Sequence, residues 1–229
     1  MSISVAMAVF NGEKYIKEQI LSILKQLNKY DELVISYDKS SDNTYRIISE
    51  LAIRDNRIKI FSGSSCGIIK NFENALRHCK NDYIFLSDQD DIWLDNKVSY
   101  VINEFKKSDA SVILHDCIVV NEKNETLYPS FFKFRHCRPG FLFNFLHNSY
   151  IGCCMALKRE FLTNVLPFPQ NIPMHDQWIG LLAEKKQSVS FLNVPLIKYR
   201  RHAENASRLH NFNFIQMIKY RVNLFKALK

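Results

Sequence analysis

Three aspartates crowd into four positions at residues 88–91, directly after a run of apolar and aromatic residues. The carboxylates of Asp88, Asp90 and Asp91 repel one another, and without a cation that repulsion raises the pKa of each group. A hard divalent cation relieves the repulsion and is best held by oxygen ligands. The spacing therefore predicts a metal site at the end of a strand. The alternative is an acidic turn in which Asp91 or Asp95 caps the following helix.

Length and composition indicate one globular domain. The chain has 229 residues and a hydrophobic share of 47%, enough for a sizeable core. No apolar run approaches the roughly 20 residues of a membrane-spanning helix, and the N-terminus lacks the basic-then-apolar order of a signal peptide. We therefore expect a cytoplasmic protein. The six cysteines include no C-x-x-C pair, so reduced and mostly buried thiols are expected.

The formal net charge of +8 predicts an anionic partner, which could be nucleic acid, a membrane surface or a phosphorylated small molecule. Residues 209–229 combine Lys219, Arg221 and Lys226 with large apolar side chains, as in a basic amphipathic helix on an anionic membrane. The alternative is a helix that packs its apolar face on the domain. Nucleic acid is not expected, because the aromatic residues do not alternate with arginine in a stripe.

The elements that position the acidic cluster alternate between strand and helix. Short apolar runs predict buried strands at residues 3–9, 33–37, 58–61 and 83–86. Apolar residues at helical spacing predict helices from residue 13, after a cap at Asp42, and over residues 68–76. This alternation predicts an α/β fold with a mostly parallel central sheet and helices on both faces.

Polar residues follow three of these strands. Asn11 follows the first, Asp38 the second, and the acidic cluster the strand at residues 83–86. Parallel sheets bind ligands where loops leave the carboxyl ends of strands, so the three sites are expected to converge. The chain has neither G-x-G-x-x-G nor G-x-x-x-x-G-K-[ST], which excludes the usual dinucleotide and P-loop phosphate sites. A nucleotide whose phosphates are held by a metal ion is the ligand that remains.

The second half of the chain should provide the remaining groups of the site. Strands are expected at residues 111–120 and 151–157, and a short helix at residues 159–166. Asp176 stands where another helix begins, a position at which aspartate commonly caps the helix. The segment at residues 128–145, rich in Phe, Arg and Pro, fits neither helix nor strand and is interpreted as a mobile loop.

The order of these motifs resembles that of a family 2 glycosyltransferase with the GT-A fold. The motifs are Val9-Phe10-Asn11-Gly12-Glu13, Asp38 with Ser40-x-Asp42-x-Thr44, Gly67 with Asn71, and Ser87-Asp88-Gln89-Asp90-Asp91. The last is similar to the form in bacterial rhamnosyltransferases of cell-surface polysaccharide synthesis, such as that of lipopolysaccharide or capsule. The resemblance implies one domain at residues 1–208, with a nucleotide-sugar half at 1–105, a smaller mixed acceptor half at 106–208, and a basic helix at 209–229.

The resemblance also implies a UDP- or dTDP-linked sugar donor and a set of residues that bind it. These are Val9, Phe10, Asn11, Glu13, Asp38, Gly67, Asn71, Asp88 and Gln89. The metal is implied to be Mn²⁺ or Mg²⁺, held by Asp90 and His202. The chain departs from the family at Tyr37 and Lys39, where an Asp and a Gly are usual. Taken singly, Asn11, Glu13 and Asp38 fit ordinary turns and helix starts equally well.

Asp176 is implied to be the general base of an inverting, metal-dependent transfer to a glycan or lipid-linked oligosaccharide, at the inner face of the cell membrane. His175, Trp178, Arg200 and Arg201 are the implied contacts of the acceptor or diphosphate. One alternative is a nucleotidyltransferase acting on sugar phosphates, which should carry a glycine-rich basic first loop. Another is a catalytically inactive binding scaffold, which the two departures from the family pattern would support.

Overall fold

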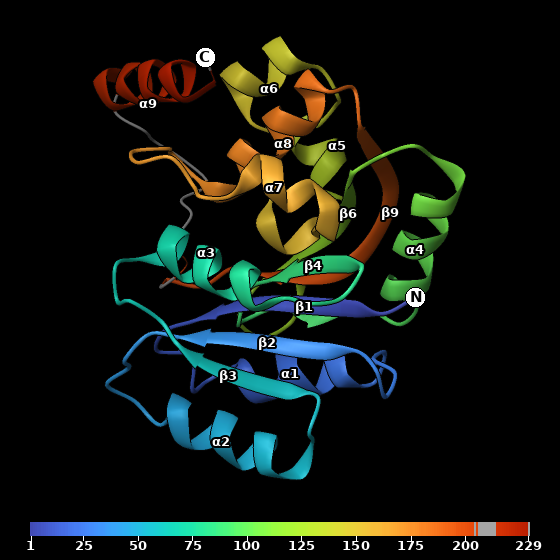
Figure 1. Cartoon of the computed structure of the whole chain (residues 1–229), viewed down its shortest axis with the longest axis vertical. Helices are drawn as coiled ribbons and strands as arrows, with labels where there is room; N and C mark the ends of the chain where they lie inside the picture. The colour runs from blue at the N-terminus through green and yellow to red at the C-terminus, as the bar shows by residue number, and fades with distance from the viewer. Residues whose placement is uncertain (204, 206–213, 229) are drawn as a thin grey trace.

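A computed structural model of the chain describes residues 1–203, 205 and 214–228. A nine-stranded sheet runs through it in the order β3-β2-β1-β4-β8-β6-β9-β5, with β7 paired to β6. Helices α1 and α2 lie on one side of this sheet and α3 and α7 on the other (Figure 1). The architecture confirms the predicted α/β class with a central sheet covered on both faces.

The first half of the chain forms the parallel part of the sheet. Its strands are β1 (Ile3–Val9), β2 (Glu32–Tyr37), β3 (Ile58–Ser62) and β4 (Tyr83–Ser87), and its helices are α1 (Ile16–Leu24), α2 (Thr44–Arg54) and α3 (Ile68–His78). Strand β1 is buried along its whole length and pairs in parallel with β2 and β4. The carboxyl ends of these strands therefore meet at one edge, as the sequence predicts.

The second half is mixed in strand direction. It contains β5 (Ile92–Trp93), α4 (Lys97–Lys107), β6 (Val112–Val120), β8 (Met155–Lys158) and β9 (Val189–Arg200). Strand β8 runs antiparallel to β4 and β6, whereas β9 is parallel to β6 and antiparallel to β5. The pairing of Ile92 with Lys198 brings the end of β9 beside the acidic loop.

The prediction of a mobile loop at residues 128–145 is wrong. This segment forms the end of β7 (Thr126–Tyr128) and helices α5 (Phe131–Arg135) and α6 (Phe141–His147). Asp116 accepts hydrogen bonds from the Phe132 N–H at 2.9 Å and the Ser130 hydroxyl at 2.5 Å, and Asn144 donates to Glu184 at 3.1 Å. These partners are distant in sequence, so the local pattern does not reveal the order they impose.

Several predicted boundaries also differ. Helix α1 starts at Ile16 because residues 12–15 form a turn, in which the N–H groups of Tyr15 and Ile16 donate to the Gly12 carbonyl. The strand expected at residues 151–157 begins as the 3-10 turn η1 (Gly152–Cys154) before β8. The remaining elements are η2 (Arg159–Phe161), α7 (Leu162–Val165), α8 (His175–Lys185) and α9 (Phe214–Leu228).

Neither Asp91 nor Asp95 is the N-cap residue of α4. That residue is Asn96, in the left-handed conformation with φ 66°, whereas Asp91 is only 1% exposed and accepts the Arg200 N–H. The acidic turn is therefore not a simple helix cap. Likewise, α2 begins at Thr44 with Asn43 as its cap residue, although the Asp42 carboxylate does accept the Thr44 N–H at 3.0 Å.

The predicted basic helix at the end of the chain is present as α9, while residues 209–213 and 229 lie outside the described part. All six cysteines are free, and four of them are buried.

Within the described ranges, no helix has the length and apolar character needed to span a bilayer.

Candidate active site

Gln89 fastens the loop after β1 to the acidic loop after β4. Its Oε1 accepts the Phe10 N–H at 2.9 Å, and its Nε2 donates to the Phe10 carbonyl at 2.7 Å. Gly12 makes this approach feasible, because a Cβ at that position would lie 2.6 Å from the same Oε1. The amide of Gln89 is thus used within the protein, and the exposed ring of Phe10 stays available to a ligand.

Asn11 and Glu13 hold the loop between β2 and α2. The Asn11 Oδ1 accepts the Ser41 N–H at 2.9 Å, and Asn11 has a positive φ of 47°, which asparagine tolerates better than most residues. The Glu13 carboxylate accepts the Asn43 N–H at 2.7 Å, at the start of α2, where negative charge is stabilising. Both residues lie at the predicted edge, and their binding of the donor stays a prediction.

Asp38 is buried beside the loop that leads into α3. Its side chain accepts the Ser65 N–H at 2.8 Å and is only 4% exposed as a residue. Asn71 donates to the Val9 carbonyl at 3.2 Å, and its Oδ1 is buried with no hydrogen-bond partner among the described residues. Gly67 has a φ of 89° where α3 begins. Asp38 and Asn71 thus lie close together, since a Cβ at Gly63 would approach the Oδ1 atoms of both, at 2.1 and 2.8 Å.

Gly63 offers a test of the role of Asp38. A Cβ there would lie 2.1 Å from the Asp38 Oδ1, and the backbone at Gly63 has no positive φ that would itself resist alanine. Gly63→Ala should therefore displace the Asp38 carboxylate and raise the donor KM about 10- to 100-fold, the loss of a charged hydrogen bond, with little change in kcat. Steady-state kinetics beside the exposed neighbour variant Ser64→Ala check this, and an unchanged KM would contradict it.

Tyr37, one of the two departures from the family pattern, has a definite structural role. Its hydroxyl accepts the Ser40 N–H at 2.9 Å, and its ring lies 5.1 Å from that of Tyr45. The Ser40 hydroxyl in turn accepts the Asn11 N–H at 2.9 Å. The tyrosine thus supports the loop after β2, so that its presence does not indicate a decayed site.

Asp90 lies against two side chains from the far end of the chain. Its Oδ2 is 2.7 Å from the His202 Nε2, a residue 112 positions away, and accepts from the Asn205 Nδ2 at 3.2 Å. A carboxylate oxygen beside an imidazole nitrogen is a donor set that suits Mn²⁺ or Mg²⁺, so the residues fit the predicted ion. Asn205 is a further site residue that the sequence did not single out, although it closes the His-x-x-Asn loop.

Arg200 holds the acidic loop in place. Its backbone N–H donates to the Asp91 Oδ1 at 3.0 Å, its Nε donates to the Asp90 carbonyl at 2.9 Å, and a terminal nitrogen pairs with Glu18 at 2.8 Å. The guanidinium is buried and therefore positions the loop. Arg201 donates to the Tyr199 hydroxyl at 3.0 Å. The predicted contact of these arginines with a diphosphate stays a prediction.

The acidic loop concentrates negative charge in a buried place. Burial, followed by the charges of Asp91, Asp90 and Asp176, raises the pKa of Asp88 well above its usual range. Burial and the charge of Asp90 raise the pKa of Asp91 to about 7. Ligand atoms of Asp88, Asp91 and Cys153 lie within 4.8 Å of one another. A bound cation would offset this repulsion, as the residue spacing predicts.

Asp176 lies in the first turn of α8, facing this cluster. Its two oxygens accept the Gly152 N–H at 3.1 Å and the Gln177 N–H at 2.6 Å. Burial raises the pKa of Asp176 to about 6, and its charge contributes to the raised pKa of Asp88. A carboxyl group with a pKa close to neutrality, fixed by two backbone donors, has the properties of a general base.

A sequence model described as Glycosyl transferase family 2 matches residues 4–166, from β1 to the end of α7. The chain belongs to this family. It is therefore a glycosyltransferase, and the matched residues include the three converging loops and most of the sheet.

Two curated glycosyltransferases are similar in sequence to most of this chain. One is the UDP-Glc:alpha-D-GlcNAc-diphosphoundecaprenol beta-1,3-glucosyltransferase WfgD of Escherichia coli, to which the chain is 29% identical over 201 residues. This alignment covers 86% of this chain and 76% of WfgD. The chain is also 29% identical over 222 residues to the dTDP-rhamnosyl transferase RfbG of Shigella flexneri, covering 87% of this chain and 72% of that protein.

Solved structures of glycosyltransferases share the fold. Staphylococcus aureus TarS 1-349 in complex with UDP-GlcNAc aligns with a TM-score of 0.72 and 19% identity, over 99% of this chain and 67% of that 1-349 chain. Glucosyl-3-phosphoglycerate synthase from Mycobacterium tuberculosis, in complex with Mn²⁺, UDP and glucosyl-3-phosphoglycerate, aligns with a TM-score of 0.61 and 18% identity, over 99% of this chain and 78% of that one. This chain spans only part of each of these relatives.

His175 and Trp178 of this family 2 glycosyltransferase are buried beside Asp176. The His175 ring stacks on Phe72 at 4.1 Å, and burial lowers its pKa to about 3, so the imidazole is neutral. Trp178 donates its indole N–H to the Val165 carbonyl at 3.1 Å. Both side chains pack in the interior and thereby hold the first turn of α8, which carries Asp176. Their predicted contact with an acceptor or diphosphate stays a prediction.

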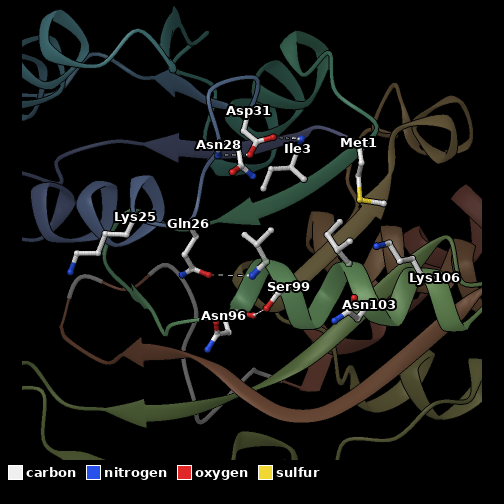
Figure 2. A pocket seen from close by; sticks show the side chains of 12 residues that line it. Met1, Ile3, Lys25, Gln26, Asn28, Asp31, Asn96, Ser99, Asn103 and Lys106 are labelled. Carbon is white, nitrogen blue, oxygen red and sulfur yellow. Dashed lines mark hydrogen bonds between the residues drawn. The ribbon is translucent and has the colours of Figure 1, made fainter.

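A hollow of about 450 Å³ lies apart from these residues (Figure 2). Its lining includes Met1 and Ile3 at the amino end of β1, and Ser99 on α4. The candidate site lies at the opposite, carboxyl end of β1. Beside the hollow, Asp31 accepts the Ile3 N–H at 2.8 Å and so ties the first strand to the turn before β2. This hollow is therefore separate from the candidate site.

Proposed function

We propose that this glycosyltransferase moves a sugar from a nucleoside-diphosphate donor to an acceptor hydroxyl with inversion of configuration. The observation that supports the proposal most is the convergence of two groups on one sheet edge. Asp90 lies 2.7 Å from His202, while Asp176 is close enough to Asp88 to raise its pKa. These observations support a metal-binding pair and a general base within one two-substrate site.

In the proposed reaction, the ionised Asp176 accepts the proton of an acceptor hydroxyl. That oxygen attacks the anomeric carbon from the face opposite the diphosphate, and the bond from carbon to diphosphate oxygen breaks with its electron pair leaving on the nucleoside diphosphate. The N–H groups of Gly152 and Gln177 keep the carboxylate oriented throughout. One displacement inverts the configuration, and no covalent intermediate on the protein is needed.

Asp90 and His202 would hold the Mn²⁺ or Mg²⁺ ion, next to Asp88 in the same loop. A bound divalent cation would supply Lewis-acid stabilisation of the charge that develops on the leaving diphosphate. The chain's own contribution is the position of the two ligands. Arg200 fixes the backbone at Asp90 and Asp91, and Asn205 donates to both the Asp90 carboxylate and the Arg200 carbonyl.

The donor is proposed to be a UDP- or dTDP-linked sugar, and the acceptor a glycan or lipid-linked oligosaccharide in cell-surface polysaccharide synthesis. The names of the two relatives support these classes, since one uses UDP-Glc with a diphosphoundecaprenol-linked acceptor and the other is a dTDP-rhamnosyl transferase. We place the donor half at residues 1–105, the acceptor half at 106–208, and the protein at the cytoplasmic face of the membrane.

Incubation with a panel of nucleotide sugars and Mn²⁺ tests the proposal, with nucleoside diphosphate release as the readout. At least one UDP- or dTDP-sugar should be consumed, and the anomeric configuration of the product should be opposite to that of the donor. Retention of configuration would overturn the mechanism. Tight donor binding without any release would favour the inactive scaffold. Family membership sets aside the nucleotidyltransferase.

The raised pKa of Asp176 gives a specific pH dependence. Because burial shifts this pKa up to about 6, the carboxyl group holds its proton below that pH and cannot act as a base. We expect kcat/KM to rise about tenfold per pH unit below pH 6 and to level off above it. A profile measured at saturating Mn²⁺ checks this. A midpoint near pH 4, the ordinary range of an aspartate, would contradict it.

A further inference from the structure

Helix α9 is attached to the domain along one side. Leu224 is fully buried against the core, and the Lys185 ammonium donates to the Leu228 carbonyl at 3.0 Å. Arg221 donates to the Leu146 carbonyl at the end of α6, and Asn223 donates to the Asn171 carbonyl at 3.2 Å. These bonds join α9 to α6, to α8 and to the loop before α8. The helix thus has a definite inward side.

The outward side of α9 is apolar in its middle. Ile218 is 50% exposed, Val222 45% and Phe225 55%, and their spacing of four and three residues aligns them in one stripe. Lys219 and Lys226, both exposed, lie together along one side of this stripe. An exposed aliphatic stripe beside lysines is the pattern of a helix that lies in a membrane interface.

Helix α6 adds a second exposed apolar pair next to α9. Leu142 is 75% exposed and Leu146 53%, and they are one helical turn apart. The hydrogen bond from Arg221 to the Leu146 carbonyl fixes the two helices as neighbours. A cation is again close, since the Arg138 guanidinium lies 4.3 Å from the centre of the Phe143 ring. We call Leu142, Leu146, Ile218, Val222, Phe225, Lys219 and Lys226 the α6–α9 surface.

The two segments of the chain that carry this surface are basic, while Glu184 of α8 is engaged at the start of α6 by the Gly140 N–H and the Asn144 amide. Residues 126–159, which contain α6, include five Lys or Arg residues and no Asp or Glu. Residues 205–229, which contain α9, also include five Lys or Arg residues and no Asp or Glu. A second copy of this chain would bring two such basic surfaces together and be repelled. An anionic lipid headgroup is the complementary partner for exposed aliphatic side chains bordered by lysine.

We propose that the α6–α9 surface docks this protein on an anionic phospholipid bilayer, with the exposed aliphatic side chains in the interface and Lys219 and Lys226 on the headgroups. No spanning helix is required, because such a surface lies in the plane of the interface. Helix α6 is joined to α8 through Asn144, whose carbonyl accepts the amide of Gln177, the residue after Asp176. Docking would therefore place Asp176 on a helix adjoining the bilayer, where a lipid-linked substrate resides.

Flotation with phospholipid vesicles tests this surface. The chain should bind vesicles that contain 30% phosphatidylglycerol and float poorly with pure phosphatidylcholine. The double variants Ile218→Ser with Val222→Ser, and Leu142→Ser with Leu146→Ser, should each lower the partition coefficient about tenfold or more, since each removes two exposed apolar side chains that would enter the bilayer interface. Lys219→Glu with Lys226→Glu should lower it to a similar extent, with a strong dependence on salt.

Ile53→Ser is the matched control, because Ile53 is 86% exposed on α2 and outside the α6–α9 surface. Circular dichroism shows whether each variant folds. Donor-dependent release of nucleoside diphosphate, measured without lipid, tests the proposed sugar transfer independently of membrane binding. Equal binding to neutral and anionic vesicles, unchanged binding by the variants, or a dimer in analytical ultracentrifugation that the same variants dissociate would each overturn the proposal.

Discussion

Replacing Asp176 with Asn is expected to lower kcat by about 10²- to 10⁴-fold, the range that a positioned general base contributes. The asparagine has the shape of the aspartate and still accepts the N–H of Gln177 or Gly152, but it cannot take a proton from the acceptor hydroxyl. Donor affinity should change by no more than about threefold, because Asp176 acts on the acceptor. Calorimetric titration of the donor and steady-state kinetics separate the two effects.

The control for this variant is Asp109→Asn, which makes the same change at an exposed position between α4 and β6. Its kcat should equal that of the unmodified chain. The pH dependence below pH 6 should disappear from the residual activity of Asp176→Asn. A variant that keeps more than a tenth of the kcat, or the same pH midpoint, would show that another group removes the proton.

Asp90→Asn is expected to have an effect of similar size through a different step. Removing one carboxylate ligand weakens the binding of Mn²⁺, and a bound metal contributes several kcal/mol of charge stabilisation, so kcat/KM should fall about 10³-fold. Titration of Mn²⁺ in the presence of the nucleoside diphosphate should show weaker ion binding. Higher Mn²⁺ concentrations should restore part of the activity, which they cannot do for Asp176→Asn.

Asp91→Asn is the matched comparison in the same loop. Asp91 is 1% exposed and its Oδ1 accepts the Arg200 N–H, so this residue is expected to support the loop and not the ion. Its variant should retain most of the Mn²⁺ affinity, and its melting temperature should change, since a buried carboxyl group with a raised pKa is replaced. If Asp91→Asn loses the ion and Asp90→Asn keeps it, the two roles are reversed.

The nucleotide-binding half was predictable because its local signals agree. Each strand in the first 87 residues is a short, mainly apolar run, and each helix carries an apolar face. From that order, the rule for parallel sheets places Asn11, Asp38 and Asp88 at a common edge. The distant pair of Asp90 and His202 follows from family resemblance, because no spacing rule connects residues 112 positions apart.

The rest of the site depends on contacts that a single sequence does not display. Lys97 is fully buried, with its ammonium 4.1 Å from the centre of the Trp93 ring and 2.9 Å from the Cys153 carbonyl, yet it reads as an ordinary helix lysine. Gln89 resembles a ligand contact but ties two loops together. Helices α5 and α6 were not predicted because they are short. In addition, α6 carries Leu142 and Leu146 on its exposed side, where an amphipathic helix would carry polar residues, so its sequence shows no helical pattern of apolar and polar residues.

The bonds between the acidic loop and the end of β9 have a consequence for how the chain is made. Ribosomes add about 5–20 residues per second, so Asp90 emerges about 6 to 22 seconds before His202, 112 positions later. During that interval the parallel half of the sheet can fold, but the loop lacks Arg200, His202 and Asn205 to organise it. Until residues 200–205 have been made, a nascent chain is therefore unable to assemble the complete acidic loop.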